Sequence, residues 1–272
     1  MKRNVTKRAR VKKYIIGAVA GLLTVIVVVL FLLWNRYLNK NSLLTRFVAE
    51  NGQEIYLLGT YHENHFNKWL NYSMEDMLCV VENVQPDVVF LEAREEYFEQ
   101  YGVVDGPIDM SVVYSYCLEH DIPVEFVDWW VVDNNYQSGT TSEMRDDAIF
   151  GNIKGKLQSL WQNENVLVVC GGGHFYEQAK RFERAGFAEK KMSQKGTYFS
   201  SEGVTFAYPA STAEVWEKRA YFYAYTYPEI VGADETLDES IKKQFTGGNH
   251  DAFYKQQLKY CDWFRENVLF EE

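Results

Sequence analysis

Residues 166–174 read VLVVCGGGH, and this stretch decides the fold that we expect. Five apolar residues, three of them valine, run into three glycines and His174. Such a run is typical of a buried strand, and we expect a helix to start just after His174 and to end at Gly186. Residues 55–62, IYLLGTYH, repeat the same order, with an apolar run followed by G-x-x-H. The sequence therefore predicts two strands that each lead into a histidine.

Two further apolar runs, at residues 88–91 and 124–127, also read as buried strands. Helical patterns separate the four strands, with Ser73 and Asp109 as candidate N-terminal caps. This alternation predicts an α/β fold with a mixed, largely parallel central sheet flanked by helices. After Phe187 the pattern changes to a hairpin over residues 197–206 and several helices, which indicates a C-terminal α+β extension packed on the core.

The net charge of −10 over 272 residues is unevenly distributed. The first 40 residues hold nine Lys or Arg and no acid, whereas the remainder has twice as many acids as bases and a net charge of −19. An acidic body argues against nucleic acid as a partner, because phosphate contacts need a basic surface. The four cysteines include no C-x-x-C pair, which excludes a Cys-cluster zinc site and a disulfide scaffold.

Residues 15–34 are uncharged and long enough to cross a bilayer as a helix. A cleaved signal peptide has a shorter apolar run and a small-x-small cleavage site, so we expect an uncleaved signal-anchor in contact with membrane lipid. Seven bases precede the span, and the positive-inside rule then predicts a single-pass protein of the cell membrane with a cytoplasmic N-terminus and an extracytoplasmic C-terminal domain. The expected organisation is a basic tail over 1–14, the transmembrane anchor over 15–34, a linker over 35–53, the α/β core over 54–186 and the extension over 187–272.

The carboxyl ends of parallel strands meet at one edge of a sheet, where ligands of α/β proteins bind. At these ends the sequence places His62, Glu92 and His174. Two imidazoles and a carboxylate form the ligand set of an open divalent-metal site, here for Mn, Co or Zn. Because His174 stands at a helix start, we expect the helix dipole to keep its imidazole neutral, which is the form that binds metal.

Other residues at these ends are candidates for substrate binding or for support of the site. They are Gly59, Arg94, Asp128, Asn152, Gly171, Gly172 and Gly173, and Arg145 joins the catalytic candidates. Structural roles are alternatives to these assignments. The glycines can simply allow tight turns, Glu92 and Arg94 can form an ion pair, and Asp128 can be a turn residue. Arg145 and Asn152 can lie on a solvated helix face. The aromatic run over residues 221–227 fits either a peptide groove or an aromatic core.

Four ordered blocks resemble the TraB/GumN and Tiki superfamily and its erythromycin-esterase-like and ChaN-like relatives. The blocks are LLGTYH at 57–62, QPDVVFLEAR at 85–94, MRDDAIFGNI at 144–153 and VLVVCGGGHF at 166–175, with the Asp128 strand end between the second and third. The resemblance implies an active site formed by His62, His174 and Glu92, with Arg145 from the helix block. Animal Tiki members are membrane-anchored, metal-dependent peptidases.

We therefore expect a membrane-anchored, extracytoplasmic, metal-dependent hydrolase that acts on a peptide or protein substrate. Two alternatives remain open from the residues alone. One is a non-catalytic surface protein that binds a peptide or haem in the same cleft, and the other is a metal-free esterase that uses one histidine as its base.

Overall fold

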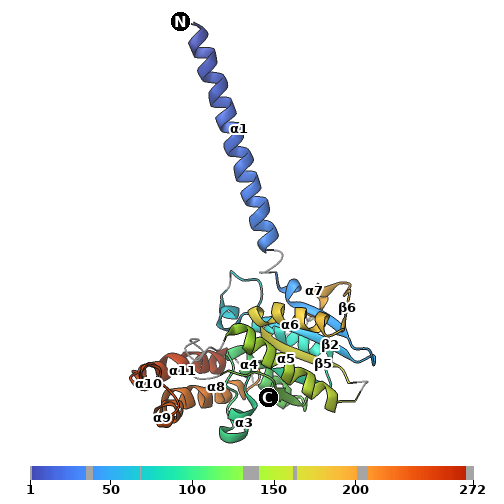
Figure 1. Ribbon diagram of the computed structural model, residues 1–272, viewed down its shortest axis with the longest axis vertical. Helices are drawn as coiled ribbons and strands as arrows, with labels where there is room; N and C mark the ends of the chain where they lie inside the picture. The colour runs from blue at the N-terminus through green and yellow to red at the C-terminus, as the bar shows by residue number, and fades with distance from the viewer. Residues whose placement is uncertain are drawn as a thin grey trace. The chain divides into compact units, whose positions relative to one another are not determined.

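The computed structural model describes residues 2–34, 39–67, 69–130, 141–161, 164–200 and 208–267. The chain divides into two compact units, Met1–Ser42 and Leu43–Glu272. The first unit contains helix α1 (Lys2–Leu33), within which Ile15–Leu33 is long and apolar enough to cross a membrane (Figure 1). By length and composition, this segment agrees with the expected anchor.

The second unit is built on a six-stranded mixed sheet in the order β4-β3-β5-β2-β1-β6. The strands are β1 (Leu44–Val48), β2 (Glu54–Thr60), β3 (Val88–Leu91), β4 (Val124–Phe126), β5 (Val166–Gly171) and β6 (Ala188–Lys190). Neighbours among β4, β3, β5 and β2 are parallel, whereas β1 is antiparallel to both β2 and β6. The expected α/β fold is confirmed, with a sheet that is mostly but not fully parallel. Strands β1 and β6 lie outside the expected core range of 54–186.

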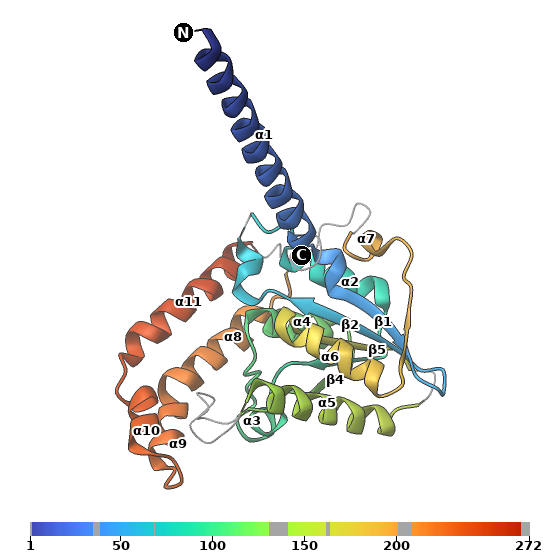
Figure 2. The same ribbon diagram turned by 45° about the horizontal axis from the view of Figure 1, so that its top comes forward.

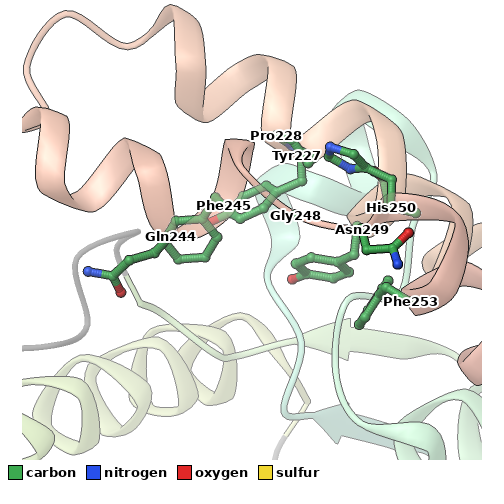
Figure 3. Close-up of a pocket in the computed structure, with 10 residues that line it drawn as sticks. Tyr227, Pro228, Gln244, Phe245, Gly248, Asn249, His250 and Phe253 are labelled. Carbon is green, nitrogen blue, oxygen red and sulfur yellow. The ribbon is translucent and has the colours of Figure 1, made fainter.

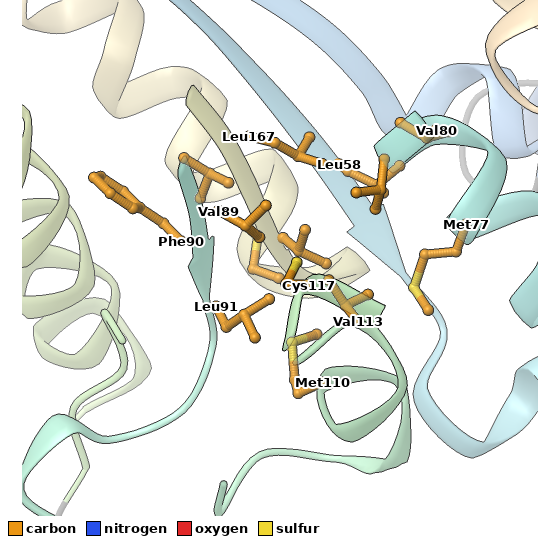
Figure 4. Packing of buried hydrophobic residues seen from close by; sticks show 14 of the residues in the cluster. Leu58, Met77, Val80, Val89, Phe90, Leu91, Met110, Val113, Cys117 and Leu167 are labelled. Atoms are coloured by element: carbon orange, nitrogen blue, oxygen red, sulfur yellow. The ribbon is translucent and has the colours of Figure 1, made fainter. Parts of the chain in front are cut away.

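Helices flank this sheet, and their bounds are α2 (Met74–Val84), α3 (Glu95–Tyr101), α4 (Ile108–Glu119), α5 (Ser142–Ser159), α6 (Gly172–Arg184) and α7 (Lys195–Tyr198). Ser73 caps α2 as expected, because its hydroxyl accepts from Asp76 N while the Asp76 carboxylate accepts from Ser73 N. In Figure 4, residues of α2 and α4, including Met77 and Val113, pack together with Val89 and Leu91 of β3.

The opposite face of the sheet is turned toward α5 and α6 (Figure 2). Phe182 of α6 stacks on Phe47 of β1 at a ring distance of 5.0 Å and meets Phe150 of α5 edge-on at 5.3 Å. Phe90 points to the other side of β3 from Val89 and Leu91, as strand geometry requires (Figure 4). Strand β3 is therefore apolar on both faces, which is why its four residues form an unbroken apolar run.

The described residues from 208 onward are mostly helical. They include α8 (Thr212–Tyr221), the π-helix η4 (Phe222–Thr226), α9 (Tyr227–Ala233), α10 (Glu239–Thr246) and α11 (His250–Asn267). Helix α8 packs on α4, and α11 packs on α8 (Figure 2). The expected hairpin over 197–206 is wrong at its start, where Thr197 and Tyr198 are helical, and residues 201–206 lie outside the described part of the chain.

Candidate functional site

The parallel strands bring the three main candidates to one edge of the sheet. His62 begins the short 3₁₀-helix η3 (His62–Phe66) after β2, Glu92 directly follows β3, and His174 lies in the first turn of α6 after β5. Because β5 lies between β2 and β3, side chains from both neighbours approach its end. His62 has a φ of 53°, an uncommon value for a residue other than glycine.

Gly171 shows how closely His62 and Glu92 approach each other. A Cβ at Gly171 would lie 2.5 Å from His62 Nε2 and 3.3 Å from Glu92 Oε2. The two side chains thus converge on one point above the last residue of β5. The amide of Gly171 donates to Glu92 Oε2 at 2.5 Å, which fixes the carboxylate in this position. Glycine is required here because any side chain would occupy the space of the imidazole.

Each histidine is held by a carboxylate through its Nδ1 atom. His62 Nδ1 is 3.1 Å from Oδ2 of the fully buried Asp109, which also accepts from His62 N at 3.2 Å. His174 Nδ1 is 2.6 Å from Oδ1 of Asp146. Nε2 of His174 faces Glu92 Oε1 at 3.4 Å. His174 therefore turns Nε2 toward Glu92, and Nε2 of His62 lies over Gly171 on the same side as the Glu92 carboxylate. A carboxylate that holds Nδ1 and leaves Nε2 available is an arrangement known for histidines that bind metal.

Arg145 joins two of the strand-end acids. Its Nη2 donates to Glu92 Oε1 at 3.0 Å and to Asp128 Oδ2 at 2.8 Å, and its Nε donates to Asp128 Oδ1 at 2.9 Å. Asn152, two turns further along α5, donates to the carbonyl of Val127 at 3.1 Å and so fixes the backbone just before Asp128. Arg145 thus faces the sheet edge, whereas Asn152 is exposed and contacts this edge through its side-chain amide.

The remaining candidates lie at the margin of this group or outside it. Arg94 is buried in an ion pair with Asp105 and makes no described contact with Glu92. A Cβ at Gly59 would meet Leu43 and Phe175, so this glycine serves the packing of α6 on β2. A Cβ at Gly172 would lie 3.3 Å from the Thr60 carbonyl oxygen, and a Cβ at Gly173 would meet nothing within 4 Å.

Burial and neighbouring charges shift the pKa of each site group. Burial lowers the pKa of His62, but Asp109 outweighs it and raises that pKa to about 9, while the pKa of Asp109 falls to about 2. Burial also lowers the pKa of His174, yet Asp146 and Glu92 raise it overall. The direction of this shift is opposite to the one expected from the helix dipole, because the two carboxylates favour the imidazolium. Burial raises the pKa of Glu92, which His174 partly opposes.

These shifts predict how pH changes the stability of the chelator-treated protein. The folded pKa of His62 lies above its ordinary value of 6.5, so its stabilisation is complete below that pH and is lost as pH rises through about 9. The folded pKa of Asp109 lies below 3.8, so its contribution is lost as pH falls toward 2. We expect the melting temperature to fall between pH 6.5 and 9, and Asp109→Asn to reduce that fall. An unchanged slope in Asp109→Asn would contradict the pairing.

Sequence reasoning missed both carboxylates that hold the histidines. It assigned Asp109 as a helix cap, but Pro107 occupies the N-cap position of α4, and the Asp109 carboxylate contacts His62 instead. Asp146 was not singled out, although it directly follows Arg145 in the MRDD block. Both side chains are at least nine-tenths buried, and a carboxylate buried on a helix near a strand end is the signal that identifies them.

His65, the other histidine of η3, has a structural role. Its Nε2 accepts from Tyr61 N at 2.9 Å, and its Nδ1 donates to the Tyr72 carbonyl at 3.0 Å. Burial lowers the pKa of His65. Both ring nitrogens are thus committed to backbone groups, and His65 fixes the loop that carries His62.

Two pockets are lined by residues other than His62, Glu92 and His174. One, of about 290 Å³, lies between η4, α9, α10 and the start of α11 and is lined by Tyr227, Phe245, His250 and Phe253 among others (Figure 3). The other, of about 570 Å³, is lined by Phe66, Tyr208, Tyr260 and Trp263 among others. Phe222 and Tyr227 of the aromatic run at 221–227 are buried, which agrees with an aromatic core. Tyr223 and Tyr227 also line the first pocket, and a peptide groove stays a prediction.

The donor set has the chemistry of a metal site, with two Nε2 atoms and one carboxylate. Among the residues that the structure describes, however, no group of three or more His, Cys, Asp or Glu side chains is placed to hold a metal ion as it stands. No protein-family model matches the chain, and neither the curated proteins nor the solved structures contain a match. The metal ligands and the TraB/GumN and Tiki resemblance therefore stay predictions.

Proposed function

We propose that this protein is a metal-dependent hydrolase of peptides that is anchored to a membrane by its first helix. The observation that carries the proposal is the pair of histidines from separate strand ends, each held at Nδ1 by a carboxylate. Nε2 of His174 faces Glu92, and Nε2 of His62 lies with the Glu92 carboxylate over Gly171. Such pairs are typical of sites that bind metal or move protons, and purely structural histidines more often bond the backbone, as His65 does.

His62, His174 and Glu92 would hold the ion, while the other residues prepare the site. A bound Mn, Co or Zn would polarise a scissile carbonyl and lower the pKa of a bound water. Asp109 and Asp146 fix the orientation of the two rings. Arg145 holds Glu92 and Asp128 together and compensates part of their charge.

A second candidate is acid–base hydrolysis without metal, and the ionisation of the site favours it. With a pKa of about 9, His62 carries a proton at neutral pH and can donate it to a leaving group. Glu92 is buried, has a raised pKa and faces both rings, which suits a carboxylate that accepts a proton from water.

Peptide cleavage by the full-length protein in detergent separates these candidates. Mass spectrometry of a mixed peptide library incubated with Mn²⁺ should reveal new termini, and both EDTA and His174→Ala should abolish them. Cleavage that survives chelation but is lost in His174→Ala would support the metal-free reaction. A Soret band on haem titration without any cleavage would contradict both and favour a binding protein.

We also propose that the N-terminus is cytoplasmic and the acidic domain extracytoplasmic. The bases before Ile15 support this orientation through the positive-inside rule. Ser193 is exposed and all four native cysteines are buried, so Ser193→Cys provides a selective label. We expect a membrane-impermeant maleimide to label Ser193→Cys in intact cells and to leave the wild-type protein unlabelled. Labelling only after lysis would indicate the opposite orientation, with a cytoplasmic C-terminal domain.

A further inference from the structure

Arg94 is buried in a cluster of side chains next to the candidate site. Its side chain is 1% exposed, and its Nε donates to Asp105 Oδ2 at 2.6 Å while its backbone amide donates to Asp105 Oδ1 at 2.7 Å. The guanidinium carbon lies 3.6 Å from the ring centre of Tyr97 and 3.8 Å from that of Trp130. This cation is held on several sides, which leaves it little freedom to move.

The C-terminal helices contribute to the same cluster. Arg94 Nη2 donates to the hydroxyl of Tyr223 at 3.2 Å, and that hydroxyl donates to Asp105 Oδ2 at 3.4 Å. Arg219 on α8 donates through Nε to the Asp105 carbonyl at 3.2 Å. Tyr223 belongs to the π-helix η4, a type of distorted turn that occurs frequently at functional sites.

The cluster adjoins the backbone of three site carboxylates. Arg94 is two residues after Glu92, Trp130 is two residues after Asp128, and Asp105 is four residues before Asp109. Gly106 packs on the site directly, since a Cβ there would lie 2.4 Å from the Glu92 carbonyl oxygen. Any shift of Arg94 and Asp105 would therefore move the backbone of Glu92 and the start of α4.

We propose that Arg94, Asp105 and Tyr223 form a clasp through which the C-terminal helices position Glu92 and Asp109. These are positioning residues, because they act on the site through the backbone of its carboxylates and make no described contact with His62 or His174. The effect on metal binding rests on the proposed function, whereas the effect on the geometry of the imidazoles does not.

The test compares two tyrosines of the C-terminal helices in the full-length protein. Tyr223→Phe removes the hydroxyl of the clasp, whereas Tyr254→Phe removes a hydroxyl that donates to Glu217 at 3.3 Å and lies outside the clasp. We expect the imidazole NMR signals of His62 and His174 to move in Tyr223→Phe with EDTA present, and the Mn²⁺ affinity to fall about tenfold. Tyr254→Phe should change neither. Arg94→Lys keeps the charge but loses the planar fork, and should cause larger shifts in the same direction.

Unchanged imidazole signals in both Tyr223→Phe and Arg94→Lys would overturn the clasp. Equal shifts in Tyr223→Phe and Tyr254→Phe would also overturn it, because they would reflect a general loss of stability. If the wild-type protein neither binds Mn²⁺ nor cleaves peptides, the proposed function fails, and the imidazole signals alone still decide whether the clasp positions the site.

Discussion

Replacing Gly171 with alanine is expected to lower peptide cleavage about 10²-fold while the fold remains intact. The new Cβ would lie 2.5 Å from His62 Nε2 and 2.7 Å from its Cε1, so the imidazole must leave its place beside Glu92. A displacement of about 1 Å in a catalytic group costs a factor of that size. The backbone tolerates alanine, because Gly171 has a φ of −57° and a ψ of 149°.

Gly173→Ala is the matched control for this prediction. It adds the same methyl group two residues further along, where nothing lies within 4 Å of the new Cβ. Alanine is also favoured over glycine within a helix by up to about 1 kcal/mol. We expect Gly173→Ala to keep its activity and to melt at the same or a higher temperature. Equal activity in the two variants would show that His62 does not act from its position over Gly171.

The second large effect is expected for Glu92→Gln, which should lower cleavage by about 10²- to 10³-fold without lowering stability. Glutamine keeps the shape of the side chain but removes the charge that pairs with Arg145 and faces His174 Nε2. Because burial raises the pKa of Glu92, its ionised form costs stability at neutral pH, and a neutral replacement relieves that cost. Activity and melting temperature should therefore change independently.

Glu95→Gln controls for the loss of a carboxylate near the same strand end. Glu95 is half exposed and pairs with Lys156 at 2.7 Å, so its removal should change cleavage and melting temperature only slightly. If Glu92→Gln keeps full activity, or if both variants lose it equally, Glu92 has no special role in the reaction.

The sequence predicted the part of the site that follows from strand order. VLVVCGGGH and IYLLGTYH are apolar runs that end in glycine and histidine, and parallel pairing necessarily brings their ends to one edge. The α/β architecture follows from the same alternation of strands and helices. These features are local patterns combined with one topological rule, so they can be read without coordinates.

The partners of the histidines could not be read in this way. Asp109 and Asp146 lie on helices far from His62 and His174 in sequence, and their pairing depends on how α4 and α5 are docked on the sheet. Asp109 also satisfied the pattern of a helix cap, a local explanation that concealed its tertiary contact. The direction of the pKa shift at His174 was missed for the same reason. The sequence indicates that His174 stands at a helix start, but it does not indicate that Asp146 lies beside the ring.

A calorimetric titration of the chelator-treated, full-length protein with Mn²⁺ decides whether His62 and His174 hold a metal ion. We expect the wild-type chain to bind a single ion, more tightly as pH rises and the imidazoles lose their protons. We expect His62→Ala and His174→Ala each to abolish this binding. His120→Ala, which changes a histidine stacked on Tyr116 at the end of α4, should bind as the wild type does. Binding that persists unchanged in His62→Ala and His174→Ala, or no binding by the wild-type protein, would contradict this expectation.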